Sequence, residues 1–150
     1  MRRAITLGRR GMTVGDGGPF GAVIVKRGAI VGEGWNRVVA TGDPTAHGEI
    51  VAIRAACRRL GTFRLSGGDL YTTGEPCPMC LSAIYWARID RIFFGFTVGD
   101  AARIGFDDRV LYRQLARPAA RRTIPAVQLL AAEARALARE YAANPRRAKY

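Results

Sequence analysis

The chain has 150 residues, a length that suits one domain. Hydrophobic residues make up 49% of it, which excludes a disordered or fibrous protein. No apolar run approaches the roughly 18 residues of a membrane span, and no signal peptide is evident. The formal charge of +12, from 24 Lys and Arg against 12 Asp and Glu, raises nucleic acid or another polyanion as a partner.

The excess charge lies at the two ends of the chain. Residues 1–14 carry four arginines and no acid, whereas residues 15–112 carry 11 basic and 10 acidic side chains. Residues 113–150 carry 9 basic and 2 acidic side chains. Among the basic residues only Lys26 and Lys149 are lysine, so a genomic codon bias explains the composition as readily as a binding surface does.

The first part of the chain predicts a short helix and a β-hairpin. The helix spans residues 2–10 and turns inward an apolar side formed by Ala4, Ile5 and Leu7. A glycine-rich loop over residues 15–19 follows. Gly21–Lys26 and Ala29–Trp35 then predict the two arms of a hairpin. The first arm is almost continuously apolar, as in a strand that is buried on both faces.

Helices and strands alternate along the rest of the chain. Apolar residues recur at helical spacing over Thr45–Leu60, and Gly61 ends that helix. The elements predicted after it are a strand over Asp69–Thr73, a helix over Cys77–Ala87, a strand over Arg91–Phe96, a candidate strand over Val127–Leu130 and a helix over Ala131–Ala143. This alternation predicts an α/β fold in which helices cover a sheet.

Two short segments carry metal-binding chemistry. Thr45–Glu49 contains His47, the only histidine of the chain, and residues 75–80 contain the thiols of Cys77 and Cys80. One imidazole and two thiolates suit zinc, and three protein ligands leave a fourth position for water, as in catalytic sites. A lone histidine also excludes a second histidine ligand and a Ser–His dyad.

The spacing explains how these residues share one site. Cys77 and Cys80 are three apart and lie on one face in the first turn of their helix. Residues two apart do not share a face, so His47 binds from the edge of its helix and Glu49 stays unbound nearby. Both helices then direct N-termini at the metal, which favours thiolate over thiol.

The third cysteine does not belong to this group. Cys57 lies about 15 Å along the helix from His47, too far to reach the same ion. We therefore interpret it as a small buried hydrophobic residue, which excludes a four-ligand structural zinc ribbon. Glu49, by contrast, is placed to move the proton of a water whose pKa zinc lowers to about 7.

His-x-Glu followed by Pro-Cys-x-x-Cys is the signature of zinc deaminases. Beyond it, Pro19–Tyr150 resembles bacterial guanine deaminases of the cytidine deaminase-like superfamily, through the segments PFGAVIV, DPTAHGE, EPCPMC, SAIYWAR, GFDD and RTIP. The resemblance implies a three-layer α/β/α fold with a mixed five-stranded sheet, and one catalytic domain over residues 1–150. It also implies a homodimer whose subunits can exchange their C-terminal segments.

The resemblance also implies roles for individual residues. One zinc ion per subunit is held by His47, Cys77 and Cys80, and Glu49 is the proton shuttle. The residues expected to bind the substrate are Phe20 and Trp86 as pocket aromatics, Asn36 as an amide that binds the base, Asp108 as a carboxylate that contacts the base and helps to transfer protons, and Tyr150 as a C-terminal lid.

Each substrate residue has a plain structural alternative. Phe20 and Trp86 are also typical of a core, and Asn36 of a turn. Of the two acids before the next expected helix, Asp107 is the better candidate for its cap, which leaves Asp108 for the substrate. Terminal residues such as Tyr150 are usually poorly ordered.

Two glycines depart from the pattern of the family. Gly48 stands where the His-x-Glu motif more often has alanine, and costs up to about 1 kcal/mol in helix propensity. Gly74 stands where relatives carry a larger residue. These departures concern the shape of the pocket and not the chemistry.

The sequence thus predicts an enzyme, a cytoplasmic zinc-dependent aminohydrolase that converts a free purine base, foremost guanine, to xanthine and ammonia. Deamination of adenosine in tRNA, or of another small amino-heterocycle such as isocytosine or an aminotriazine, remains open. A non-catalytic zinc module with a basic surface is the alternative from another class. The prediction includes no membrane association and no nucleotide cofactor, because both common glycine-rich phosphate loops are missing from the sequence.

Overall fold

A computed structural model describes residues 1–149. Its sheet has the strand order β2-β1-β3-β4, formed by β1 (Gly21–Lys26), β2 (Ala29–Trp35), β3 (Gly68–Gly74) and β4 (Arg91–Phe96). β1 pairs antiparallel with both of its neighbours, whereas β3 and β4 run parallel, so the sheet is mixed. The first four residues of β1 are all buried, which confirms the expected strand with two covered faces.

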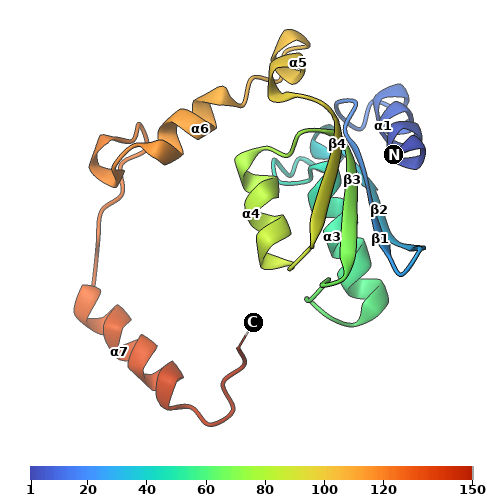
Figure 1. Cartoon of the computed structure of the whole chain (residues 1–150). Coiled ribbons are helices and arrows are strands. Elements are labelled where there is room, and N and C mark those ends of the chain that lie inside the picture. The colour runs from blue at the N-terminus through green and yellow to red at the C-terminus, as the bar shows by residue number, and fades with distance from the viewer. Residues whose placement is uncertain (150) are drawn as a thin grey trace. The chain divides into compact units, whose positions relative to one another are not determined.

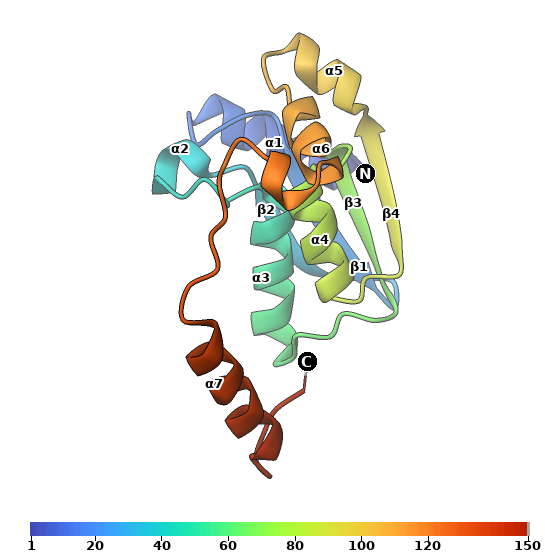
Figure 2. The ribbon, with the colours of Figure 1, turned by 90° about the vertical axis from the view of Figure 1, so that its left-hand side faces the viewer.

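Helices cover the two faces of this sheet (Figure 1). α1 (Arg2–Thr13) packs on one face, where Ala4, Leu7 and Val23 form a small core. α3 (Gly48–Leu60) and α4 (Pro78–Trp86) lie side by side on the other face, as Figure 2 shows, and the main core lies beneath them. The connecting loops contain the short helices α2 (Val38–Thr41) and α5 (Val98–Arg103).

α3 lies close against β2 because the strand presents glycines to it. A Cβ atom on Gly34 would lie only 2.5 Å from the carbonyl oxygen of Gly48, and one on Gly32 only 2.4 Å from that of Ala52. Any side chain at these two positions would push the helix outward. The contact fixes how closely the first turn of α3 approaches the sheet.

The chain divides into two compact units, residues 1–112 and 113–150. α6 (Arg109–Ala116) crosses the division, and the second unit adds a 3₁₀ turn (Ala119–Arg121) and α7 (Ala131–Ala143). No residue between 113 and 149 is buried. Among residues 1–149, no helix combines the length and the apolar character that crossing a membrane requires.

Most predicted elements are confirmed, and the hairpin, β4 and α7 have the expected bounds. The helix expected from Thr45 begins only at Gly48. Ile5 does not point inward but is 43% exposed, because α1 packs through Ala4, Leu7, Gly8 and Gly11.

The sheet has four strands within the described residues, so the expectation of five is wrong by one. Val127–Leu130 forms no strand there. A segment counts as a strand only when its backbone pairs with a neighbour, and apolar composition does not supply that neighbour.

Candidate metal centre and substrate cleft

The three predicted metal ligands come together at the N-termini of two adjacent helices. His47 is the N-cap of α3, Cys77 is the N-cap of α4, and Cys80 lies in the first turn of α4. The Nδ1 atom of His47 lies 3.6 Å from Sγ of Cys77 and 3.5 Å from Sγ of Cys80. A zinc ion with bonds of about 2.0–2.3 Å would hold tetrahedral ligand atoms roughly 3.5 Å apart, so the three donors fit it.

The electrostatics of the centre favour a cation. A hydrogen bond from Cys80 lowers the pKa of Cys77 to about 4, with a further contribution from His47. The same contact, together with burial, raises the pKa of Cys80. The hydrogen bond with Cys77 raises the pKa of His47. At neutral pH the pair therefore holds a thiolate and one proton, and a metal ion takes the place of that proton.

Glu49 lies beside the metal ligands and is not one of them. Its side chain is buried, with 4% of the residue exposed, and burial raises the pKa of its carboxyl group. Thr72 Oγ1 donates a hydrogen bond to Oε1 over 3.2 Å, and Cys80 Sγ contacts Oε2 at 3.5 Å. Desolvation therefore favours the protonated form of this carboxyl group.

A cleft of about 620 Å³ opens in front of this centre, entirely within the first unit. His47, Glu49 and Cys77 line it, together with Phe20 and Asn36, whose roles in substrate binding stay predictions. The ring of Phe20 packs edge-to-face on that of Phe106, 4.9 Å between centroids. The volume is typical of small-molecule sites.

Asn36 is held rigidly at the rim of the cleft. Its backbone N–H donates to the carbonyl of Phe20 over 2.7 Å, and its Oδ1 accepts from the backbone N–H of Val38 over 3.2 Å. Gly17 packs directly on it, because a Cβ atom there would lie 2.0 Å from the Asn36 Oδ1 atom. With its carbonyl oxygen engaged, the amide can offer its NH₂ group to a ligand.

Asp108 carries an unsatisfied polar atom. Its Oδ1 atom is fully enclosed and has no hydrogen-bond partner among residues 1–149. Burial raises the pKa of this carboxyl group, and the Cys77 thiolate adds to the effect. Asp107 next to it accepts from the backbone N–H of Arg109 over 3.1 Å, but α6 begins at Arg109, so Asp107 lies one position before the N-cap and the expectation that it caps the helix is not confirmed. A buried acceptor without a partner in a cleft indicates that a ligand supplies the donor.

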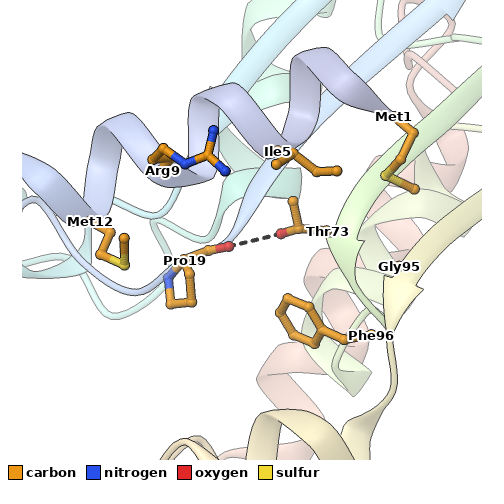
Figure 3. Close-up of a pocket in the computed structure, with 8 residues that line it drawn as sticks. All are labelled: Met1, Ile5, Arg9, Met12, Pro19, Thr73, Gly95 and Phe96. Carbon is orange, nitrogen blue, oxygen red and sulfur yellow. Dashed lines mark hydrogen bonds between the residues drawn. The ribbon is translucent and has the colours of Figure 1, made fainter.

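Phe20 is held in place by a threonine of the sheet. Thr73 Oγ1 donates to the carbonyl of Pro19 and accepts from the N–H of Gly21, both over 3.0 Å. Figure 3 shows the first of these bonds beside an apolar pocket of about 330 Å³ between α1 and the ends of β3 and β4. The backbone on both sides of Phe20 is thereby fixed to β3.

The two glycine departures have steric causes. A Cβ atom on Gly48 would lie 2.8 Å from the carbonyl oxygen of Phe20. Glycine at position 48 therefore lets the backbone of Phe20 lie close to the first turn of α3. A Cβ atom on Gly74 would lie 2.7 Å from the ring of Phe96 and 3.1 Å from that of Phe20. In this chain aromatic rings fill the space that a larger residue at position 74 would need.

Two predicted substrate residues are not placed at the cleft. Trp86 is 60% exposed on α4 and does not line the cleft, and Tyr150 lies outside the described residues. Their roles stay predictions. The sequence reasoning missed Glu75 and Phe106, which line the cleft. Glu75 was adjacent to the metal motif, and its Oε2 accepts from the backbone N–H of Val98 over 3.1 Å.

A sheet between helices, with one histidine and two cysteines at two helix N-termini beside a buried glutamate, defines the class of zinc-dependent deaminases. The family model of the cytidine and deoxycytidylate deaminase zinc-binding region matches residues 1–96. The chain belongs to the cytidine and deoxycytidylate deaminase family, and it is a zinc-binding enzyme of that family.

Individual relatives refine this result. The chain is 53% identical to guanine deaminase of Bacillus subtilis over 133 residues, which are 89% of this chain and 85% of that protein. The X-ray structure of guanine deaminase from Bacillus subtilis matches with a TM-score of 0.96 at 48% identity, covering 99% of this chain and 95% of that one. A tRNA-specific adenosine deaminase of Agrobacterium fabrum is 51% identical over 77 residues, 51% of each chain.

The metal centre predicts which cysteine matters for zinc. We expect Cys80→Ser to lose most of its bound zinc, because a hydroxyl group is a far weaker ligand than a thiolate. Cys57→Ser should keep one zinc ion per chain, since Cys57 packs against the core outside the centre. Metal content after gel filtration, measured by atomic absorption, makes the comparison. Equal zinc in the two variants would contradict the assignment.

Proposed function

We propose that this protein is a guanine deaminase, which hydrolyses guanine to xanthine and ammonia. The similarity to guanine deaminase of Bacillus subtilis over 89% of the chain carries this proposal. The similarity to tRNA-specific adenosine deaminases is shorter or weaker, with 51% identity over half of the chain in one relative and 41% identity over 72% of the chain in another. Asp108 supports the proposal as well, because its unpartnered carboxylate oxygen suits the amine and ring N–H donors of a guanine base.

The charge of the cleft supports a free base over an RNA. Four carboxylates line it, those of Glu49, Glu75, Asp107 and Asp108, and no arginine or lysine among residues 1–149 does. A phosphate backbone is drawn to cationic surfaces, so this opening disfavours a polyanionic substrate. Guanine is neutral at pH 7, and its donors match these acceptors.

The metal ligands and Glu49 have separate roles in the proposed reaction. His47, Cys77 and Cys80 would hold zinc, which when bound supplies Lewis-acid chemistry and lowers the pKa of a water at its open position to about 7. Glu49 takes a proton from the attacking water and delivers it to the ring nitrogen next to C2. Its burial suits this role, because it raises the pKa of the carboxyl group and so makes the carboxylate a stronger base.

Oxygen and hydrogen balance over the whole reaction. The oxygen of water bonds to C2, the bond between C2 and the exocyclic nitrogen breaks, and the amine leaves as ammonia. Of the two protons of water, one ends on the ring and the other on the amine, delivered by Glu49 or Asp108. Asn36 and Asp108 orient the base by hydrogen bonds, and Phe20 supplies an apolar wall.

A screen for ammonia release tests this function. Zinc-loaded protein should release ammonia from guanine faster than from isocytosine, an aminotriazine or free adenosine. Glu49→Gln should keep its zinc and lose turnover by a factor on the order of 10²–10⁴, because the proton carrier is gone. Release from adenosine in tRNA and not from guanine would favour the alternative substrate. Zinc binding without any turnover would indicate a non-catalytic module.

Asp108 has a separate prediction. Asp108→Asn should lower kcat/KM for guanine on the order of 10–100-fold, because the amide loses a charge-assisted hydrogen bond to the base. Asp69→Asn is a matched control, since Asp69 pairs with Arg91 away from the cleft. Steady-state kinetics of both variants decides the matter. A wild-type value for Asp108→Asn would remove this residue from the substrate site.

We further propose that residues 1–150 act as one catalytic domain in the cytoplasm. The match to 95% of a guanine deaminase structure supports a single functional unit, although the chain divides into two compact parts. All three cysteines are free, and a reducing compartment keeps the thiols of the metal centre available.

Exposed apolar side chains support a homodimer. In the first unit Tyr85 and Trp86 are 73% and 60% exposed, and Phe94 on the edge strand β4 is 44% exposed. In the second unit Ile124 and Val127 are 80% and 77% exposed. Large exposed apolar patches mark interaction sites, and an unpaired edge strand invites a further strand. We propose that a second copy covers these residues by exchange of C-terminal segments.

Light scattering tests the assembly. Wild-type protein should have twice the 16.3 kDa mass of the chain, and Phe94→Asp together with Val127→Asp should shift it toward one chain, because like charges repel. These two substitutions place charges on the edge strand and on the segment expected to cover it. A monomeric wild type at micromolar concentration would contradict the dimer.

A further inference from the structure

The hydroxyl group of Thr72, a residue of the sheet, donates a hydrogen bond to the carboxylate of Glu49. Thr72 lies in β3, where it pairs with Ala22 of β1 and Phe94 of β4, and it is 0% exposed. Its Oγ1 donates to Glu49 Oε1 over 3.2 Å. This contact joins residues 23 positions apart, from the central part of the sheet and the first turn of α3.

The hydroxyl at this position is not explained by packing. Side chains alternate between the two faces of a strand, so Thr72 points to the same face as Leu70, which belongs to the main core. Valine has the same shape and would fill this place without a polar atom. A buried hydroxyl costs stability unless it is bonded, and here Glu49 provides the acceptor.

The neighbouring threonine serves a different purpose. Thr73 points to the other face and bonds only main-chain groups around Phe20, in Pro19 and Gly21. Thr72 bonds a side chain that the reaction uses. Two adjacent hydroxyls in β3 thus serve separate sides of the site, one the substrate wall and the other the proton carrier.

The contact distinguishes the two oxygens of Glu49. Oε1 is held by Thr72, whereas Oε2 faces Cys80 of the metal centre. The terminal torsion of a glutamate is broad and roughly two-fold, so nothing intrinsic to the side chain fixes the plane of its carboxylate. Proton transfer needs a donor–acceptor distance of about 2.6–3.2 Å. An anchored Oε1 leaves Oε2 in a defined position.

We propose that Thr72 is a positioning residue, whose hydroxyl holds the carboxylate of Glu49 in the orientation needed for proton transfer. This inference rests on the proposed role of Glu49. Thr72 itself does not line the cleft and is not one of the candidate metal ligands. Its loss should therefore lower kcat and leave KM and zinc content unchanged, which separates it from a residue that shapes the cleft.

Two matched pairs of variants isolate the hydroxyl. Wild type and Thr72→Val differ by an OH in place of a methyl group, and Thr72→Ser and Thr72→Ala differ by the OH alone. In the zinc-loaded enzyme, we expect kcat for guanine to fall on the order of 10–100-fold in the Val and Ala variants, as loss of orientation does. The Ser variant should recover most of the loss, with one zinc per chain throughout.

A double-mutant cycle separates positioning from packing. In the Glu49→Gln background, Thr72→Val should cause no further loss of kcat, because there is no carboxylate left to orient. An equal fall in both backgrounds, wild-type kcat in Thr72→Val, or equal kcat in the Ser and Ala variants would each overturn the proposal. Should Thr72→Val unfold, the Ser and Ala pair still decides, since both lack the γ-methyl group.

The wild-type control distinguishes this inference from the proposed function. If the wild type turns over guanine and Thr72→Val matches it, only the positioning role falls. If the wild type turns over another base, the same four proteins are compared on that base. If it turns over none, the proposed function fails first, and the positioning role falls with it.

Discussion

The close contact of α3 with the sheet is the constraint on which the site depends. Gly34 lets the first turn of α3 approach β2, and Gly48 lets that turn approach the backbone of Phe20. His47 is therefore brought to the N-terminus of α4, where Cys77 and Cys80 lie. Two helix dipoles then act on the same small volume and favour the thiolate that a cation binds.

β3 is the element that connects this centre to the rest of the site. Leu70 anchors the strand in the core, Thr72 bonds Glu49, and Thr73 bonds the backbone around Phe20. Further along, Gly74 makes room for Phe96, and the chain then enters the metal motif at Glu75. Successive residues of one strand thus hold the carboxylate of Glu49 and the backbone around Phe20.

Local chemistry was predictable from the sequence, and long-range contacts were not. The spacing of Cys77 and Cys80 placed both thiols on one face of the first turn of a helix, because helical geometry relates residues a few positions apart. The bond from Thr72 to Glu49 and the unpartnered oxygen of Asp108 depend on tertiary packing, which no pattern in the chain encodes. The prediction of a strand over Val127–Leu130 was wrong for the same reason, because a strand needs a neighbouring strand to pair with as well as an apolar sequence.

The positions of the ion pairs change how the charge of +12 is interpreted. All six ion pairs join residues between 3 and 109, and within the described part of residues 113–150 the arginines have none. The cleft, by contrast, is lined with carboxylates. The cationic excess is therefore separated from the chemistry along the chain, and a neutral base needs no cation to bind. A polyanion attracted by the arginines would meet acidic groups at the cleft, so charge disfavours RNA as the substrate.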